Sequence, residues 1–288
     1  EECLKVLEVS PQALDSDQLL CQWIRLQHIA DDISIQFSIE DLAACEGLDD
    51  PKMRFAVQGF EGQLRACNAY PIQVPKPSMS SIHAIWLITN HFLASLKLGE
   101  SITRLFLHEV ALHAGYSNDD MQPPFTEEAL KSKRPTQAAR LSAEHICSLS
   151  TSLSVIHTLF DTFLSIPVHE IRSFPTFQFV RIVYAAIVLT KMAYDATVPD
   201  SEAGRMFNRD DFKIDYYFDK LVAFLRAAAE GDRCASATKF SMVLFVMKAL
   251  LHKQTGERLC FGTNGQQATG KGRQEKDRGQ NLPQVSVP

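Results

Sequence analysis

The sequence predicts an all-α protein, a bundle of about eight or more helices followed by a disordered C-terminal tail. Apolar residues recur at alternating intervals of three and four positions through most of the chain, which places them on one face of a helix. Proline-rich segments and single glycines separate these periodic stretches. Hydrophobic residues make up 45% of the 288 residues, which is enough to bury a substantial core.

The expected helices cover, in order, residues 16–37, a segment that begins at Pro51, and residues 79–97, 101–114, 142–165, 176–195, 210–229 and 236–253. Asp15 or Ser16 is the expected N-cap of the first helix, and Asp50 is expected to cap the second. Gly99 is expected to stop the third. The run 180–189 is apolar on nearly every side, which is typical of a central, fully surrounded helix.

Composition divides the chain into an N-terminal segment (1–14), a helical domain (15–253) and a tail (254–288). The tail holds six of the 13 glycines among Gln, Arg, Lys and Asn, and it has few apolar residues, so we expect it to be disordered. The first residues contain neither an initiator Met nor a signal-peptide pattern. The chain is therefore expected to be part of a longer protein.

Charge and cysteine content exclude several classes of function. The net charge of −5 and the pI near 6.0 provide no basic field for nucleic acid or an anionic membrane. The uncharged stretch from Pro77 to Leu96 contains His, Asn and Ser residues, which favours a buried core helix over a membrane span. The seven cysteines are 18 or more residues apart, so no CxxC pair is present. Reduced thiols in a cytosolic or nuclear protein are expected.

One motif suggests a zinc peptidase. His108 and Glu109 are followed by His113, but the two histidines are five residues apart rather than four, which rotates the second imidazole by roughly 140° on an ideal helix. No downstream glutamate-bearing helix supplies a third ligand. The structural alternative is that Glu109 and His113 have no catalytic role and hydrogen-bond their neighbours at a helix end.

Two acidic pairs suggest the metal-binding box of helical prenyl-processing enzymes. Asp31-Asp32 and Asp49-Asp50 are the residues concerned, and that chemistry needs a D-D-x-x-D spacing to hold magnesium-bound diphosphate. The required third Asp is absent after Asp32. These carboxylates are therefore expected to be solvated or to cap helices, and no catalytic residue, cofactor site or metal site is predicted for this chain.

A series of segments resembles the middle and C-terminal regulatory region of fungal Zn₂Cys₆ transcription factors over roughly residues 15–253. The segments are Trp23–Asp32, Arg54–Glu61, Leu105–His113 with His108 and Glu109, Asn118–Asp120, Pro123, Pro124 and Phe125, Ile156–Leu164, Ile171–Pro175, Phe179–Ala185 and Lys239–Phe240. Two departures stand out. The six-cysteine cluster that defines the family is absent, and residues 79–99 match less closely.

The resemblance implies a nuclear regulator of RNA polymerase II transcription that is not an enzyme. Zinc and DNA contact would belong to an upstream cluster, and this chain would contact neither DNA nor a membrane. The expected partners are a small-molecule effector, the transcription machinery or a co-regulator, and a second copy in the full protein. The alternative is a helical scaffold or interaction protein of another family.

A regulatory pocket is predicted around the apolar helix 176–195. Its polar anchors would be His157, Asp161, Arg172, Arg181 and Tyr184 in a mostly apolar interior. Such a body can sense a metabolite if the ligand binds two helix packings with different affinity. The same residues are equally suited to internal ion pairs and helix caps.

Overall fold

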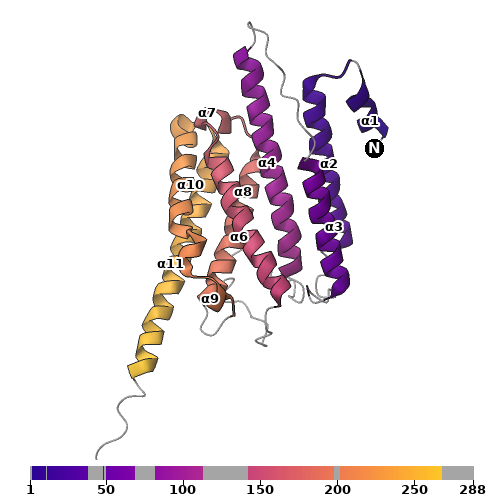
Figure 1. The fold of residues 1–288 in the computed structure, drawn as a ribbon. Helices are drawn as coiled ribbons and strands as arrows, with labels where there is room; N and C mark the ends of the chain where they lie inside the picture. Colours follow the sequence, from indigo (N-terminus) through magenta and orange to yellow (C-terminus); the bar gives the residue numbers. More distant parts are fainter. Residues whose placement is uncertain are drawn as a thin grey trace, which may run out of the picture.

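A computed structural model describes residues 2–10, 12–37, 48, 50–68, 82–112, 142–197 and 202–267 of the chain. Helices account for nearly all of this part, and no strand occurs within it. The elements, labelled as in Figure 1, are α1 (Glu2–Val9), α2 (Asp15–Gln36), α3 (Pro51–Asn68), α4 (Ile82–Leu112), α6 (Ala143–Leu164), α7 (Val168–Ile171), α8 (Thr176–Ala196), α9 (Glu202–Met206), the 3-10 helix η3 (Arg209–Phe212), α10 (Ile214–Ala229), the 3-10 helix η4 (Glu230–Asp232) and α11 (Ala235–Gln267). The predicted all-α bundle is confirmed.

Helix α4 lies between two groups of helices (Figure 1). On one side it packs on α2 and α3, and on the other it packs on α6 and α8. Leu107 of α4 joins a cluster with Ile33 and Leu64 from the first group. Leu98 and Leu105 of α4 join the larger cluster formed with α6, α8, α10 and α11. One helix therefore contributes to both apolar cores.

Helix α2 begins one residue earlier than the sequence suggested, and its cap differs. Leu14 occupies the N-cap position in place of Asp15 or Ser16. The Asp17 carboxylate accepts a hydrogen bond of 2.8 Å from the Leu14 backbone N–H. An acidic side chain in the first turn thus supplies the stabilisation expected from a polar cap. The α3 cap is as predicted, because Asp50 Oδ1 accepts from the Lys52 N–H at 2.9 Å.

The prediction of two helices around Gly99 is wrong, because α4 runs unbroken from Ile82 to Leu112. Gly99 sits inside this helix where α2 approaches closely. A Cβ at this position would lie 3.0 Å from Leu26 Cδ2 and 3.6 Å from the Trp23 ring. The glycine marks a close helix contact rather than a helix end, and periodicity alone does not distinguish the two.

Helix α8 is central, as its apolar run predicts. Its buried residues include Phe179, Ile182, Ala186 and Leu189, and α8 packs against α4, α6 and α11. In the described residues it is also the one helix long and apolar enough to cross a membrane, and 61% of its most apolar window is buried inside the bundle. That burial is typical of a core helix.

The last two predicted helices differ in their ends. The predicted helix 210–229 is divided, because Lys213 adopts a left-handed backbone (φ 48°) between η3 and α10. Gly231 has φ 72° and separates α10 from α11, as expected of a glycine at a turn. The backbone of α11 continues past residue 253 to Gln267 and projects beyond the bundle (Figure 1).

The N-terminal segment contains a short helix that the sequence did not reveal. Leu4 of α1 is buried, and its carbonyl accepts a hydrogen bond from the Cys21 thiol at 3.9 Å. Arg25 of α2 forms an ion pair with Glu8. These contacts attach α1 to α2.

Candidate functional site

The five residues predicted to form one regulatory pocket lie in three separate places. His157 and Asp161 lie together on α6 and face α10. Arg172 follows α7 and contacts the end of α10. Arg181 and Tyr184 line a small cavity between α2, α4 and α8. The single pocket is therefore replaced by distinct sites, each with its own chemistry.

The first place is built on Tyr217 of α10. The ring of His157 stacks on that of Tyr217, with centroids 4.9 Å apart. The Tyr217 hydroxyl donates to Asp161 Oδ2 at 3.3 Å. Burial, together with the Asp161 carboxylate, raises the pKa of Tyr217 to about 12, so its proton stays in this hydrogen bond. Burial also lowers the pKa of His157, which favours the neutral imidazole.

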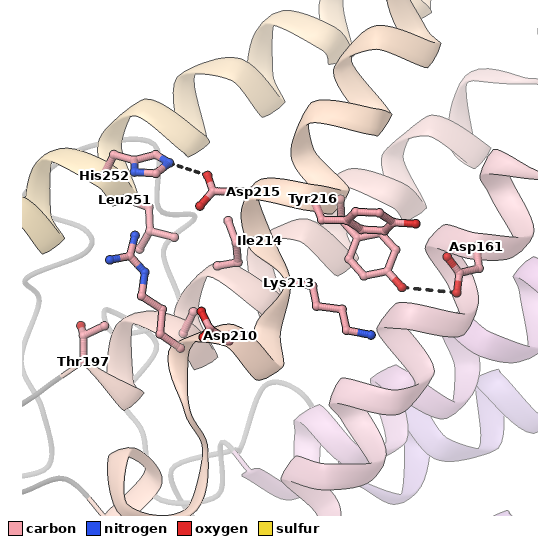
Figure 2. Close-up of a pocket in the computed structure, with 12 residues that line it drawn as sticks. Asp161, Thr197, Asp210, Lys213, Ile214, Asp215, Tyr216, Leu251 and His252 are labelled. Carbon is pink, nitrogen blue, oxygen red and sulfur yellow. Dashed lines mark hydrogen bonds and ion pairs between the residues drawn. The ribbon is translucent and has the colours of Figure 1, made fainter.

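Beside this pair, Asp161 borders a cleft of about 510 Å³ between α6, α8, α10 and α11 (Figure 2). Asp161 lies at one end, and Asp215 with its partner His252 lies at the other. His252 Nε2 is 2.7 Å from Asp215 Oδ1, and Lys248 Nζ is 3.2 Å from the same oxygen. The Asp161 and Asp215 carboxylates of this cleft therefore already have partners within the protein.

Arg172 has a structural role in this geometry. Its Nε donates to the Ala228 carbonyl at 3.0 Å, and its Nη2 donates to the Ala227 carbonyl at 3.1 Å. Both carbonyls belong to the last turn of α10, where a cation also interacts favourably with the helix dipole. Arg172 thus caps α10 from the neighbouring chain segment.

A second cleft, of about 660 Å³, lies between α3, α4 and α6 around His108. His108 is 6% exposed, and its Nδ1 lies 3.1 Å from Ser148 Oγ while its Nε2 lies 3.1 Å from Glu61 Oε1. Arg104 donates to the same Glu61 oxygen at 3.0 Å. The hydrogen bond from His108, with help from Arg104, lowers the pKa of the Glu61 carboxyl. The group forms a buried, internally paired polar network.

The peptidase motif is only partly within the described residues. His108 and Glu109 are both buried on α4, whereas His113 lies outside the described residues, as do Pro123, Pro124 and Phe125. Both ring nitrogens of His108 have protein partners, which leaves neither free for a metal in this arrangement. Within the part of the chain described, no group of three or more His, Cys, Asp or Glu residues is placed to hold a metal ion.

The acidic pairs also have ordinary roles where they are described. Asp31 Oδ1 accepts from Gln27 Nε2 at 3.0 Å on an exposed face of α2. Asp50 caps α3, and Asp49 lies outside the described residues.

Sequence reasoning missed several partners that define these sites. Tyr217 and Glu61 come from other helices, 56 and 47 residues from the groups they contact. Trp23 and Phe177 contact the Arg181 guanidinium. The sequence indicated Trp23 only through the family resemblance, and it did not single out Phe177. A buried polar residue such as His108 on an otherwise apolar face was the available signal for Glu61.

The fold and the sites together define an all-helical domain with small, polar-anchored cavities between its helices. The sequence is 27% identical over 250 residues to transcription factor pbcR from Emericella nidulans. The matched region covers 86% of this chain and 27% of that protein, so the chain spans about a quarter of its relative's length. The chain is therefore similar to part of a fungal transcription factor. No family model matches the chain, and no solved structure matches it significantly.

Proposed function

We propose that this chain is the regulatory region of a fungal transcription factor of the zinc-cluster type, which acts in the nucleus on RNA polymerase II transcription. The observation that carries the proposal is the similarity to a transcription factor along 250 residues, most of the helical body. The resemblance of the segments from Trp23 to Phe240 to this class of regulator points the same way.

In this proposal the chain regulates and another part of the protein contacts DNA. The net charge of −5 provides no electrostatic attraction to phosphates. The ion pairs of Arg54 with Glu144 and Arg104 with Glu61 compensate the basic side chains of the His108 cleft within the protein. Zinc would belong to the DNA-contacting part. The chain itself would respond to an effector or a co-regulator and would use no cofactor or catalytic group.

A reporter assay tests the regulatory role. Residues 1–288 are joined to a heterologous DNA-binding domain and an activation domain, and transcription from a cognate promoter is measured. We expect the chain to raise or lower reporter output relative to the same fusion without it. The matched controls are Ile156→Asp, which places a charge in the core, and Val246→Asp on an exposed face of α11. The first should abolish the effect, and the second should retain it.

An unchanged reporter in the presence of a folded, nuclear chain would contradict the regulatory role and would favour a helical scaffold of another family. Electrophoretic mobility shift measurements on the chain alone test whether it binds DNA directly. No binding to duplex DNA at physiological salt is expected. Tight, salt-dependent binding would show that this region contacts DNA itself.

A further inference from the structure

The cavity between α2, α4 and α8 contains an arginine that has no acidic partner among the described residues. Arg181 of α8 is partly buried there, and its one hydrogen bond within the described residues runs from Nη1 to Gln178 Oε1 at 3.2 Å. Burial lowers the pKa of its guanidinium, and no carboxylate of the described part of the chain offsets the effect. Structural arginines in cores normally have such a carboxylate.

Two aromatic rings contact this guanidinium. The Arg181 Cζ atom lies over both rings, 5.4 Å from the Trp23 ring centroid and 4.9 Å from that of Phe177. Cation–π attraction to the ring faces holds the charged group in place. Of its five N–H donors, one is engaged by Gln178 within the described residues, and the others can bind a ligand.

A second polar group in the same cavity lacks a partner. The hydroxyl of Tyr184 is buried and makes no hydrogen bond within the described residues. Tyr184 follows Arg181 by three residues on α8, so both side chains lie on one face of the helix. A buried hydroxyl without a partner costs about 1–3 kcal/mol, which a bound oxygen atom would recover.

The rest of the lining is mostly apolar, and the cavity measures about 230 Å³. Leu26 and Ala30 of α2 and Ile102 and Phe106 of α4 supply the apolar part. Gln27 and Thr103 also line the cavity, and both already have hydrogen-bond partners. Pockets for drug-sized ligands usually measure about 300–1,000 Å³, so this cavity suits a smaller metabolite. An apolar body with one anionic end would match both the walls and the two polar groups.

In the two largest described clefts, the pairing of charged groups is different. In the His108 cleft, Arg54 and Arg104 are paired with Glu144 and Glu61. In the cleft of Figure 2, the Asp161 and Asp215 carboxylates have partners in Tyr217 and His252. Arg181 differs from these groups because it is partly buried and has no carboxylate partner within the described residues, and the unpartnered Tyr184 hydroxyl belongs to a residue of the same lining.

We propose that the cavity between α2, α4 and α8 binds a small organic monocarboxylate, whose carboxylate is held by the Arg181 guanidinium and the Tyr184 hydroxyl. The Arg181 edge donates two parallel N–H bonds to the carboxylate oxygens, and the apolar body lies against Leu26 and Ile102. That such a carboxylate acts as the effector of a regulator rests on the proposed function. That the cavity binds a carboxylate does not depend on the proposed function.

Binding is measured on the full chain carrying Trp86→Phe, which leaves Trp23, beside the cavity, as the fluorescent reporter. The probes are hexanoate and benzoate, with hexanamide, benzamide and inorganic phosphate as matched controls. We expect saturable fluorescence changes with the two carboxylates at millimolar concentration or below. The amides lack the charge and phosphate lacks the apolar body, so all three should bind at least about tenfold more weakly.

Three variants locate the site. Arg181→Gln should weaken carboxylate binding about tenfold or more by loss of the charge-assisted bonds. Ala30→Leu should block binding by filling the cavity while the arginine remains in place. Arg205→Gln, an exposed arginine on α9, should leave binding unchanged. Melting curves of each variant establish that it is folded.

Absence of binding by both carboxylates, equal binding of their amides, or full binding in both Arg181→Gln and Ala30→Leu would overturn the proposal. The reporter fusion separates this result from the proposed function. A chain that binds carboxylates without altering transcription keeps the site and loses the regulatory role. A chain that alters transcription but binds neither probe loses the site alone.

Discussion

At the scale of single residues, Glu61 is the paired polar group for which the clearest dependence of stability on pH is expected. The hydrogen bond from His108 holds the pKa of the Glu61 carboxyl below its ordinary value of 4.5. A lowered carboxyl pKa means that the unfolded chain takes up a proton more readily than the folded one. The stability that this group contributes is therefore present above about pH 4.5 and is lost as pH falls through the lower folded pKa.

We expect Glu61→Gln to flatten the acid side of the stability profile. Urea unfolding from pH 7 to pH 3 measures the free energy, and the difference between wild type and variant should shrink as pH falls. Ser148→Ala removes the other partner of His108 and keeps the carboxylate, so its profile should retain the acid-side fall. Parallel profiles for Glu61→Gln and wild type would refute the assignment.

Arg172 provides a second test at this scale. Its two hydrogen bonds to the last carbonyls of α10 should make Arg172→Met less stable by about 1–2 kcal/mol. Arg205→Met removes an exposed arginine and should change stability by less than about 0.5 kcal/mol. Equal effects of the two substitutions in chemical denaturation would show that the α10 contacts contribute nothing.

At the scale of elements, the closeness of α2 and α4 depends on one glycine. Gly59 in α3 has open space around the position of a Cβ, whereas a Cβ on Gly99 would meet Leu26 at 3.0 Å. Gly59→Ala should stabilise the protein by about 0.5–1 kcal/mol through helix propensity. Gly99→Ala should lose that gain to the displaced Leu26, and the larger Gly99→Val should be destabilising by about 1–3 kcal/mol. Thermal melts of the three variants check the order.

The helices could be predicted from sequence because their apolar stripes recur with a helical period. The buried residues Met53, Val57, Phe60 and Leu64 of α3 illustrate this success. Helix ends were less predictable. From the sequence alone, Gly99 suggests the end of a helix. Its role becomes evident only in the structure, where Leu26 of α2 packs against it. Tertiary contact outweighs local propensity at such a position.

At the scale of the whole molecule, the sites were harder to predict than the fold. Arg181 and Tyr184 share a cavity because both lie on one face of α8, a relation visible in sequence. His157 and Asp161 also lie on one helix, but their partner Tyr217 arrives from α10. Sequence spacing predicts which residues lie on the same face of one helix. It does not predict which other helix packs against that face.

The end of α11 offers a test of the boundary between domain and tail. Residues that pack in the bundle, such as Leu244 and Leu251, are buried, and the backbone helix runs on to Gln267. We expect hydrogen exchange to be slow over 236–251 and fast over the predicted tail from 254. Slow exchange at 254–267 in the isolated chain would contradict a disordered tail that begins at residue 254.

Because α4 contributes Leu107 to one apolar cluster and Leu105 to the other, the two halves of the bundle share a single structural member. Neither half can melt without exposing part of this helix, so unfolding should proceed in one cooperative transition. In a Trp86→Phe background, denaturation followed by Trp23 emission, which reports on the α2 side, should coincide with the loss of helical circular dichroism from the whole bundle. A truncation that removes α2 and α3 would consequently weaken the distant α6–α11 half as well.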